Sequence, residues 1–180
     1  MLLRLVLGDG MQQTTQPGDL IFRRGSGVWT EVFSQASRQE GFYSHVGIVT
    51  KQSDGLHVWH AEADDFSGVG GVRNDPIDVF LKHSQGVAIG KLAATLFNPI
   101  AITRQATAAT WSNVPFDTSF RLDDHASSVY CTEYVWEVIR RTSNRDVVER
   151  KTVIGGVEGI TVDDLLFSRE IHIAYQRRLP

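Results

Sequence analysis

The stretch that decides the fold runs from residue 43 to residue 63 and reads YSHVGIVTKQSDGLHVWHAEA. It contains two runs, 43–51 and 56–63, rich in the β-branched and aromatic residues that strands favour. Between them lies QSDG, whose Asp-Gly pair is typical of a tight turn. The stretch therefore predicts a β-hairpin, and it places His45 near the start of the first strand.

Short strand-like runs and helical patterns make up the rest of the chain. Asp75 and Asn98 each precede a proline, which is the pattern of a capped helix start. We expect strands at 19–24, 86–93 and 170–178, and helices at 27–39, 75–83, 98–111, 127–142 and 162–168. We expect loops at 8–18 and 66–74, the second of which leads into an edge strand. Strands grouped early and helices grouped late, with short links, predict an α+β domain on a mostly antiparallel sheet.

The composition is that of an ordinary globular protein. The 180 residues are 42% apolar and 22% charged, which suits a single domain spanning 1–180. The formal net charge is −3 and the pI is close to 6.0. The chain therefore lacks the basic field that phosphate neutralisation requires, and we expect no nucleic-acid partner.

The cysteine content and the hydropathy bear on the cellular compartment. A single cysteine excludes an internal disulfide and a cysteine-rich zinc site. No stretch approaches the roughly 18 apolar residues that a membrane-spanning helix needs. The apolar start, MLLRLVLGDG, breaks at Gly8 and is shorter than the apolar core of a signal sequence. We expect a cytoplasmic protein with no stable membrane insertion.

Cys131 lies in the first turn of the helix predicted at 127–142, which we expect a serine to cap. Amides in a first turn lack partners, and the helix dipole places partial positive charge there. Both features would lower the pKa of the Cys131 thiol and could stabilise an oxyanion. The alternative is an inert core cysteine, since Cys131 shares a helix face with Val135, Val138 and Ile139.

His45 lies inside an apolar strand, where it is either a core histidine or half of a catalytic pair. It shares a strand face with Gly47 and Val49. A small residue such as Gly47 often lets another element approach closely. His45 therefore has room for a neighbour on its own face.

The hairpin supplies a candidate partner for His45. If the turn centres on residues 53–54, Glu62 lies opposite His45, whereas a one-residue bulge would bring His60 or Ala61 nearer. A carboxylate beside an imidazole can fix its tautomer and stabilise the imidazolium. The alternative for Glu62 is a solvated charge at the end of a strand.

Five motifs of the chain are GDLIFRR (18–24), YSHVGIV (43–49), VWHAEA (58–63), PFDTSF (115–120) and VYCTEYVWEV (129–138). Together they resemble a known family, the circularly permuted NlpC-type (papain-like) cysteine hydrolases and in particular their YiiX/YebB-like group. The lecithin:retinol acyltransferase-like proteins are more distant relatives. The resemblance spans roughly residues 17–140, and the histidine precedes the cysteine, as in the permuted branch.

The resemblance implies a permuted papain-like fold and a role for each matching residue. Cys131 is then the nucleophile, His45 the general base and Glu62 the orienting third member. Tyr130 and Ser44 are expected to line the pocket around the oxyanion.

The resemblance also implies a thioester acyl-enzyme and no metal or organic cofactor. The expected substrate is a small molecule, a peptide or a lipid-like molecule that carries an acyl group. An acyltransferase of the same fold, a binding domain that has lost its chemistry and a redox-sensing thiol are the alternatives.

Overall fold

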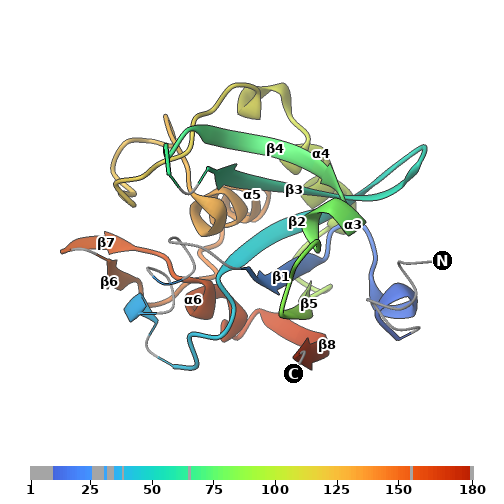
Figure 1. Cartoon of the computed structure of the whole chain (residues 1–180). Coiled ribbons are helices and arrows are strands. Elements are labelled where there is room, and N and C mark those ends of the chain that lie inside the picture. Colours follow the sequence, from blue (N-terminus) through green and yellow to red (C-terminus); the bar gives the residue numbers. More distant parts are fainter. Residues whose placement is uncertain are drawn as a thin grey trace.

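Six antiparallel strands form one sheet in the order β4-β3-β2-β1-β5-β8 (Figure 1). The computed structural model of the chain describes residues 10–25, 31, 35–37, 39–64, 66–154 and 156–178. The strands are β1 (Leu20–Arg24), β2 (His45–Gln52), β3 (Gly55–Ala63), β4 (Gly70–Pro76), β5 (Gly86–Leu92) and β8 (Ile171–Arg178). The mixture of helices and antiparallel sheet expected from the sequence is thus confirmed.

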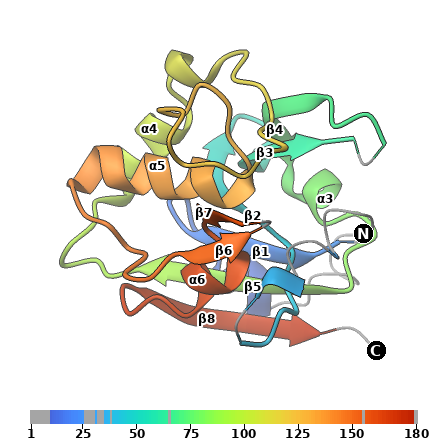
Figure 2. The ribbon, with the colours of Figure 1, turned by 90° about the vertical axis from the view of Figure 1, so that its left-hand side faces the viewer.

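Helices cover the sheet, and a small second sheet lies beside them. Figure 2 shows α5 lying across the main sheet with α4 beside it, and α5 packs on β2 and β3. The second sheet pairs β6 with β7. The bounds of these elements are α3 (Ile77–Phe80), α4 (Pro99–Ala106), the 3-10 helix η1 (Ala109–Trp111), α5 (Cys131–Ser143), β6 (Thr152–Ile154), β7 (Val157–Gly159) and α6 (Val162–Leu166).

The main sheet separates two apolar cores, because successive side chains of a strand point to opposite faces. In β2, Val46 and Ile48 join the core beneath α5, whereas Val49 joins the core on the other face. That second core also contains Phe80 of α3. By the same alternation, His45 belongs to the face that α3 covers.

The helix α5 begins at Cys131 without the serine cap that we expected. Its N-cap residue is Tyr130, whose side chain makes no capping hydrogen bond. The hydroxyls of Ser127 and Ser128 donate instead to the Asp124 carboxylate, at 2.9 and 2.8 Å. The first-turn amides of α5 therefore receive no serine oxygen.

A succession of short β-bridges anchors the start of α5 to the edge of the sheet. Gly71 of β4 forms a bridge with Pro115, and Phe116 forms one with Val129, just before α5. Gly71 has to be a glycine here, because a β-carbon would collide with the carbonyl oxygen of Val114. The position of the helix start is thus set by backbone contacts that lead back to β4.

The helix predicted at 75–83 has the wrong start. Asp75 and Pro76 belong to β4, and helix α3 begins only after them. The loop predicted at 66–74 likewise contains most of β4, although the edge strand expected beside this loop is confirmed as β4 itself. Asp75 pairs with Val58 in the β3–β4 ladder, so strand pairing overrides the local helix-start pattern.

Other expected elements are partly confirmed. The helix predicted at 98–111 is capped by Asn98, as expected, but it ends early and η1 follows it. The loop predicted at 8–18 contains a helical turn at residues 10–14. The helix predicted at 27–39 lies mostly outside the described residues. Among the described residues, no helix is long and apolar enough to cross a membrane.

The substitution Gly47→Ala is expected to destabilise the fold. A β-carbon at Gly47 would collide with the Val58 side chain and would lie 3.0 Å from the β-carbon of His60. Overpacking of this kind typically costs about 1–3 kcal/mol, which urea denaturation can measure. Gly10→Ala is the matched control, because its added carbon would only touch the Tyr175 ring at 3.5 Å. Equal stability of the two variants would contradict the close packing at Gly47.

Candidate active site

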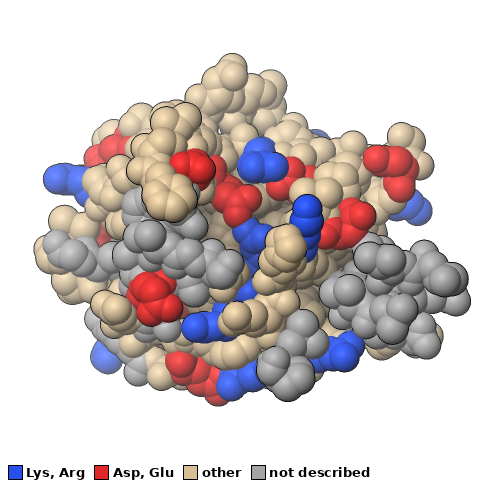
Figure 3. All heavy atoms as spheres, viewed as in Figure 1, with Lys and Arg blue, Asp and Glu red and all other residues tan. Residues whose placement is uncertain are grey.

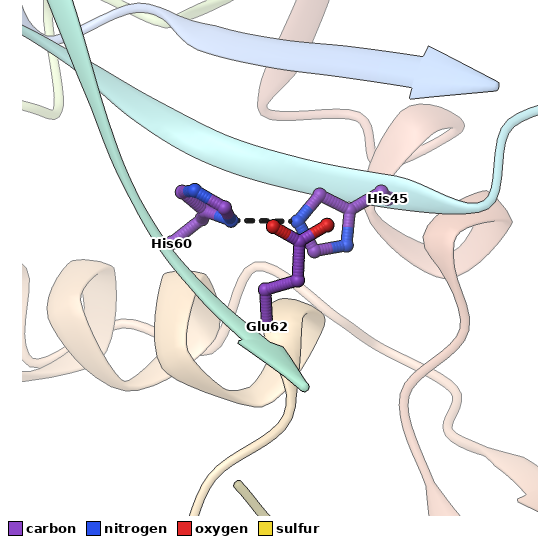
Figure 4. A group of neighbouring side chains, drawn as sticks. All are labelled: His45, His60 and Glu62. Carbon is purple, nitrogen blue, oxygen red and sulfur yellow. Dashed lines mark hydrogen bonds between the residues drawn. The ribbon is translucent and has the colours of Figure 1, made fainter. Parts of the chain in front are cut away.

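Strands β2 and β3 separate at one end, and the candidate site lies in the gap between them. Their hydrogen-bonded ladder stops at Ile48 and Trp59. Beyond that point, the described residues of β2 pair with β1, and those of β3 pair with β4. Figure 4 shows His45 from β2 lying together with His60 and Glu62 from β3.

A chain of hydrogen bonds connects the two histidines to a carboxylate. Nε2 of His45 lies 2.8 Å from Nδ1 of His60, and Nε2 of His60 lies 3.1 Å from Oδ2 of Asp75. Nη2 of Arg73 donates to the other Asp75 oxygen at 2.7 Å. Burial opposes ionisation of Asp75, but the hydrogen bonds from His60 and Arg73 outweigh it and lower the Asp75 pKa to about 2. Asp75 is therefore ionised at neutral pH and can only accept hydrogen bonds.

Phe80 and Arg23 enclose the two imidazoles. The Phe80 ring packs against both of them, with centroid distances of 5.6 Å to His45 and 4.9 Å to His60. The Arg23 guanidinium lies 4.7 Å from the centroid of the Phe80 ring, and its Nη1 donates to the Phe80 carbonyl oxygen at 2.6 Å. Arg23 is also the direct partner of His45 in the β1–β2 ladder. A fixed positive charge therefore lies beside the His45 imidazole.

Both histidines have pKa values below the ordinary range. Burial is the main cause for His45, and the positive charge of Arg23 adds to it. Burial also lowers the pKa of His60, although the hydrogen bond to Asp75 opposes the shift. The two imidazoles are therefore neutral at physiological pH.

Glu62 is paired with arginine in this structure. The predicted hairpin and its register are confirmed by the ladder between β2 and β3. The Glu62 carboxylate, however, accepts a hydrogen bond from Nη2 of Arg23, and its other oxygen lies 3.8 Å from Nη1 of Arg73. The hydrogen bond of His45 goes to His60. The expected role of Glu62 in orienting His45 stays a prediction, whereas His60 makes the contact.

The sequence does not indicate Asp75 as a candidate site residue, because Asp75 followed by Pro76 resembles a helix start. Asp75 and His60 lie on one face of the β3–β4 hairpin, two positions apart in register. Predicting residues 70–76 as a strand that pairs with β3 would have placed Asp75 near His60. The glycine-rich connection between the two strands, however, contains no turn motif that fixes their register.

Cys131 is the first residue of α5 and is 1% exposed. The backbone amides of Val46 and Thr132 hydrogen-bond with its sulfur, and Val46 directly follows His45 in β2. Burial nevertheless raises the Cys131 pKa to about 12, although the two amides and Arg23 oppose the shift. The predicted lowering of the thiol pKa is therefore wrong, because desolvation outweighs the first-turn amides. The residue is a neutral thiol in this structure.

Tyr130 and Ser44, expected to line an oxyanion pocket, hold backbone segments in place. The Tyr130 hydroxyl accepts a hydrogen bond from the Ile160 amide at 2.8 Å, and its ring packs on Phe120 at 5.2 Å. The Ser44 hydroxyl accepts from the Gly25 amide at 3.1 Å. Both residues are buried. A direct contact of either residue with an oxyanion stays a prediction.

Glu133 is a buried carboxyl group in the first turn of α5. It is 1% exposed, and its Oε2 has no hydrogen-bond partner. Burial raises its pKa to about 9, and the negative charges of Asp124 and Asp117 add to the rise. Glu133 is therefore protonated at neutral pH, and no negative charge forms there beside the Cys131 thiol.

Charges of both signs lie close together on the molecular surface. Figure 3 shows acidic and basic side chains next to one another near the middle of one face. The ion pairs Arg23–Glu62 and Arg73–Asp75 belong to this pattern of local compensation. The charged side chains beside His45 and His60 are therefore paired with one another.

The antiparallel sheet and the cysteine at the start of a packed helix define a permuted papain-like protein. Residues 14–164 match the family described as permuted papain-like amidase enzymes, YaeF/YiiX, C92 family, and the chain belongs to this family. The expected resemblance and fold class are thus confirmed, and the family supports a hydrolase activity of the cysteine type. A search of curated proteins gave no match.

A solved structure has the same fold. The crystal structure described as metalloprotein YiiX from Escherichia coli O157:H7 superposes with a TM-score of 0.74 and 17% sequence identity. The match covers 92% of this chain and 98% of the other. At this identity the likeness shows the fold alone.

The substitution Glu133→Gln is expected to stabilise the protein in alkaline solution. The folded state raises the Glu133 pKa from 4.5 to about 9, whereas the unfolded chain ionises freely above 4.5. The free energy of unfolding of the wild type should therefore fall as the pH rises from 4.5 to about 9. Glutamine is neutral at every pH, so Glu133→Gln should not show this fall in the free energy of unfolding. Urea denaturation across that range measures the difference, with the exposed Glu149→Gln as control. If the difference in the free energy of unfolding between Glu133→Gln and wild type does not change with pH, the interpretation of Glu133 as a buried neutral carboxyl is wrong.

Proposed function

We propose that the protein is a cysteine hydrolase that cleaves an amide or acyl-ester bond through a thioester on Cys131. Membership of a papain-like amidase family supports this class of activity. The observation that carries the proposal is the chain of hydrogen bonds from Asp75 through His60 to His45. The substrate is a small molecule, a peptide or a lipid-like molecule with an acyl group.

The ionised Asp75 determines where the hydrogens of both imidazoles lie. Because Asp75 only accepts, Nε2 of His60 carries the hydrogen of that ring. Nδ1 of neutral His60 then accepts, so Nε2 of His45 carries the hydrogen that it donates. Nδ1 of His45 is left with a lone pair, which is the form that a general base requires.

The resting pair consists of a neutral thiol and a neutral imidazole. Burial and the charge of Arg23 lower the His45 pKa, and burial raises that of Cys131. An ion pair between the two is therefore not formed in advance. Proton transfer from the thiol to His45 accompanies the attack on the substrate.

The proposed reaction has two stages. In the first, the sulfur of Cys131 bonds to the carbonyl carbon, Nδ1 of His45 takes the thiol proton, and the carbonyl electrons move onto oxygen. First-turn amides of α5 stabilise this oxyanion. Collapse of the intermediate breaks the bond to the leaving amine or alcohol, which receives the proton from His45. In the second stage, His45 takes a proton from a water molecule, whose oxygen bonds to the thioester carbon. The carbon–sulfur bond then breaks, the acid leaves, and His45 returns the proton to the Cys131 sulfur. Another acceptor in place of water would make the protein an acyltransferase.

An activated ester tests the nucleophile. Incubation with p-nitrophenyl acetate is expected to place one acetyl group on Cys131, which intact-mass measurement detects. Cys131→Ala should show no such adduct, and His45→Ala should acetylate much more slowly because the base is missing. Circular dichroism confirms that each variant folds. Equal release of p-nitrophenol by wild type and Cys131→Ala would contradict the proposal.

Asp75→Asn tests the hydrogen-bonded chain. Arg73 donates to one oxygen of Asp75, so the amide oxygen of the asparagine should stay on that side and its NH2 should face His60. His60 would then accept at Nε2, and the hydrogens of both rings would shift until Nδ1 of His45 loses its lone pair. We expect kcat to fall by at least about a hundredfold.

A matched carboxylate–imidazole pair provides the control for Asp75→Asn. Asp54 contacts His57 at 2.9 Å at the turn of the β2–β3 hairpin, away from the gap, so Asp54→Asn should leave kcat unchanged. Glu62→Gln should reduce kcat less than Asp75→Asn, because Glu62 does not bond with His45. An equal fall in kcat in Asp54→Asn and Asp75→Asn would contradict the proposed role of the hydrogen bonds from Asp75 through His60 to His45.

A further inference from the structure

A cavity lies beside α6, and neither His45 nor Cys131 belongs to its lining. The described residues that line it are Gln39 and members of the segments 146–150 and 163–170. We call it the α6 cavity. Its volume of about 380 Å³ falls within the usual range for sites that bind small molecules. Five of the described lining residues are acidic and two are basic, so the α6 cavity favours a cation.

Asp163 is the buried acidic residue of the α6 cavity, with an exposed fraction of 2%. Its Oδ2 accepts a hydrogen bond from the Gly41 amide at 2.9 Å. Its Oδ1 is buried and has no hydrogen-bond partner among the residues that the structure describes. Such an oxygen is costly, because it has lost contact with water and has gained no donor in return. Asp163 therefore lacks one donor, which a molecule in the cavity can supply.

The basic side chains of the α6 cavity do not supply this donor. Arg150 and Arg169 are both exposed, and Arg169 pairs with Glu149 at 3.4 Å. Within the described part of the chain, Oδ1 of Asp163 accepts from neither of them. The missing donor thus has to come from outside the described residues.

An exposed aromatic ring belongs to the same lining. Phe167 directly follows α6 and is 43% exposed, and the apolar side chain of Val147 also lines the cavity. A carboxyl group together with an aromatic ring suits an alkylammonium ion, because the N–H groups donate to the carboxyl oxygen and the methylene groups cover the apolar wall.

A metal ion fits the α6 cavity less well than an organic cation. A metal ion needs several ligand atoms that converge on one point. The described acidic side chains of this cavity do not bring three such atoms within 4.8 Å of one another. The cavity therefore favours a cation that needs one buried acceptor and an apolar surface.

We infer that the α6 cavity binds a primary ammonium group on a short aliphatic chain, with an N–H of this group donating to Oδ1 of Asp163. Free alkylamines and lysine side chains both carry such a group. This inference goes beyond the proposed function, and it stands or falls without any measurement of catalysis.

The Gly41 amide offers a local readout of binding, because it donates to the other oxygen of Asp163. Full-length ¹⁵N-labelled protein is titrated with pentylamine hydrochloride at constant ionic strength. We expect the Gly41 amide resonance to shift and to reach saturation. 1-Pentanol has the same chain length without the charge, and it should leave this resonance in place. Equal shifts with both compounds would overturn the inference.

Two variants test the assigned contacts. Asp163→Asn keeps the size of the side chain and removes its charge, so it should bind pentylamine at least about tenfold more weakly. Phe167→Ala loses the aromatic wall and should bind about threefold more weakly. The partial exposure of Phe167 makes this variant usable even if Asp163→Asn does not fold.

Asp78→Asn is the matched control for these variants. Asp78 is an exposed acidic residue of α3, and α3 packs in the core on the other face of the main sheet. Asp78→Asn should bind pentylamine like the wild type. Undiminished binding of pentylamine to both Asp163→Asn and Phe167→Ala would overturn the assigned contacts.

Nα-acetyl-lysine amide distinguishes the two sources of the ammonium group. If it binds more tightly than pentylamine, the cavity recognises a lysine side chain. If pentylamine binds more tightly, the cavity recognises a free amine. If neither compound shifts the Gly41 resonance of the wild type, the α6 cavity is not an ammonium site.

Discussion

The hydrogen bond between the Asp75 carboxylate and His60 is the interaction on which the candidate site depends. Its direction is fixed, because an ionised carboxylate has no hydrogen to give, and the Asp75 pKa of about 2 keeps it ionised. Each ring in turn then has one defined donor and one defined acceptor. The negative charge of Asp75 on the edge strand β4 thus determines, through His60, which ring nitrogen of His45 carries the hydrogen.

The backbone architecture brings strand β2 to the start of α5, which carries the cysteine. Where β2 and β3 separate, side chains from both strands share the gap, and the Val46 amide is close enough to hydrogen-bond with the sulfur of Cys131. Gly47 leaves the space into which His60 fits. The bridges from β4 through Phe116 to Val129 hold the start of α5 at the same end of the sheet.

The electrostatic environment favours neutral reactants at rest. Arg23 and burial keep His45 unprotonated, burial keeps Cys131 as a thiol, and Glu133 is protonated in the first turn of α5. A buried thiolate and imidazolium would each need compensation for lost hydration. The same neutrality leaves a lone pair on each imidazole, which a proton relay through the two rings requires.

The sequence by itself determined the hairpin, its register, the helix that carries Cys131 and the family, because strand alternation, a tight turn and contiguous motifs are local patterns. His45 and Cys131 were identified as candidates for the same reason. Only the tertiary structure decided that His60 contacts His45, that Asp75 holds His60 and that Glu62 pairs with Arg23. The protonation state of the Cys131 thiol also depended on tertiary structure. First-turn amides are predictable from a helix start, but the desolvation that raises the Cys131 pKa comes from packing against the sheet, and packing arises between elements distant in the chain.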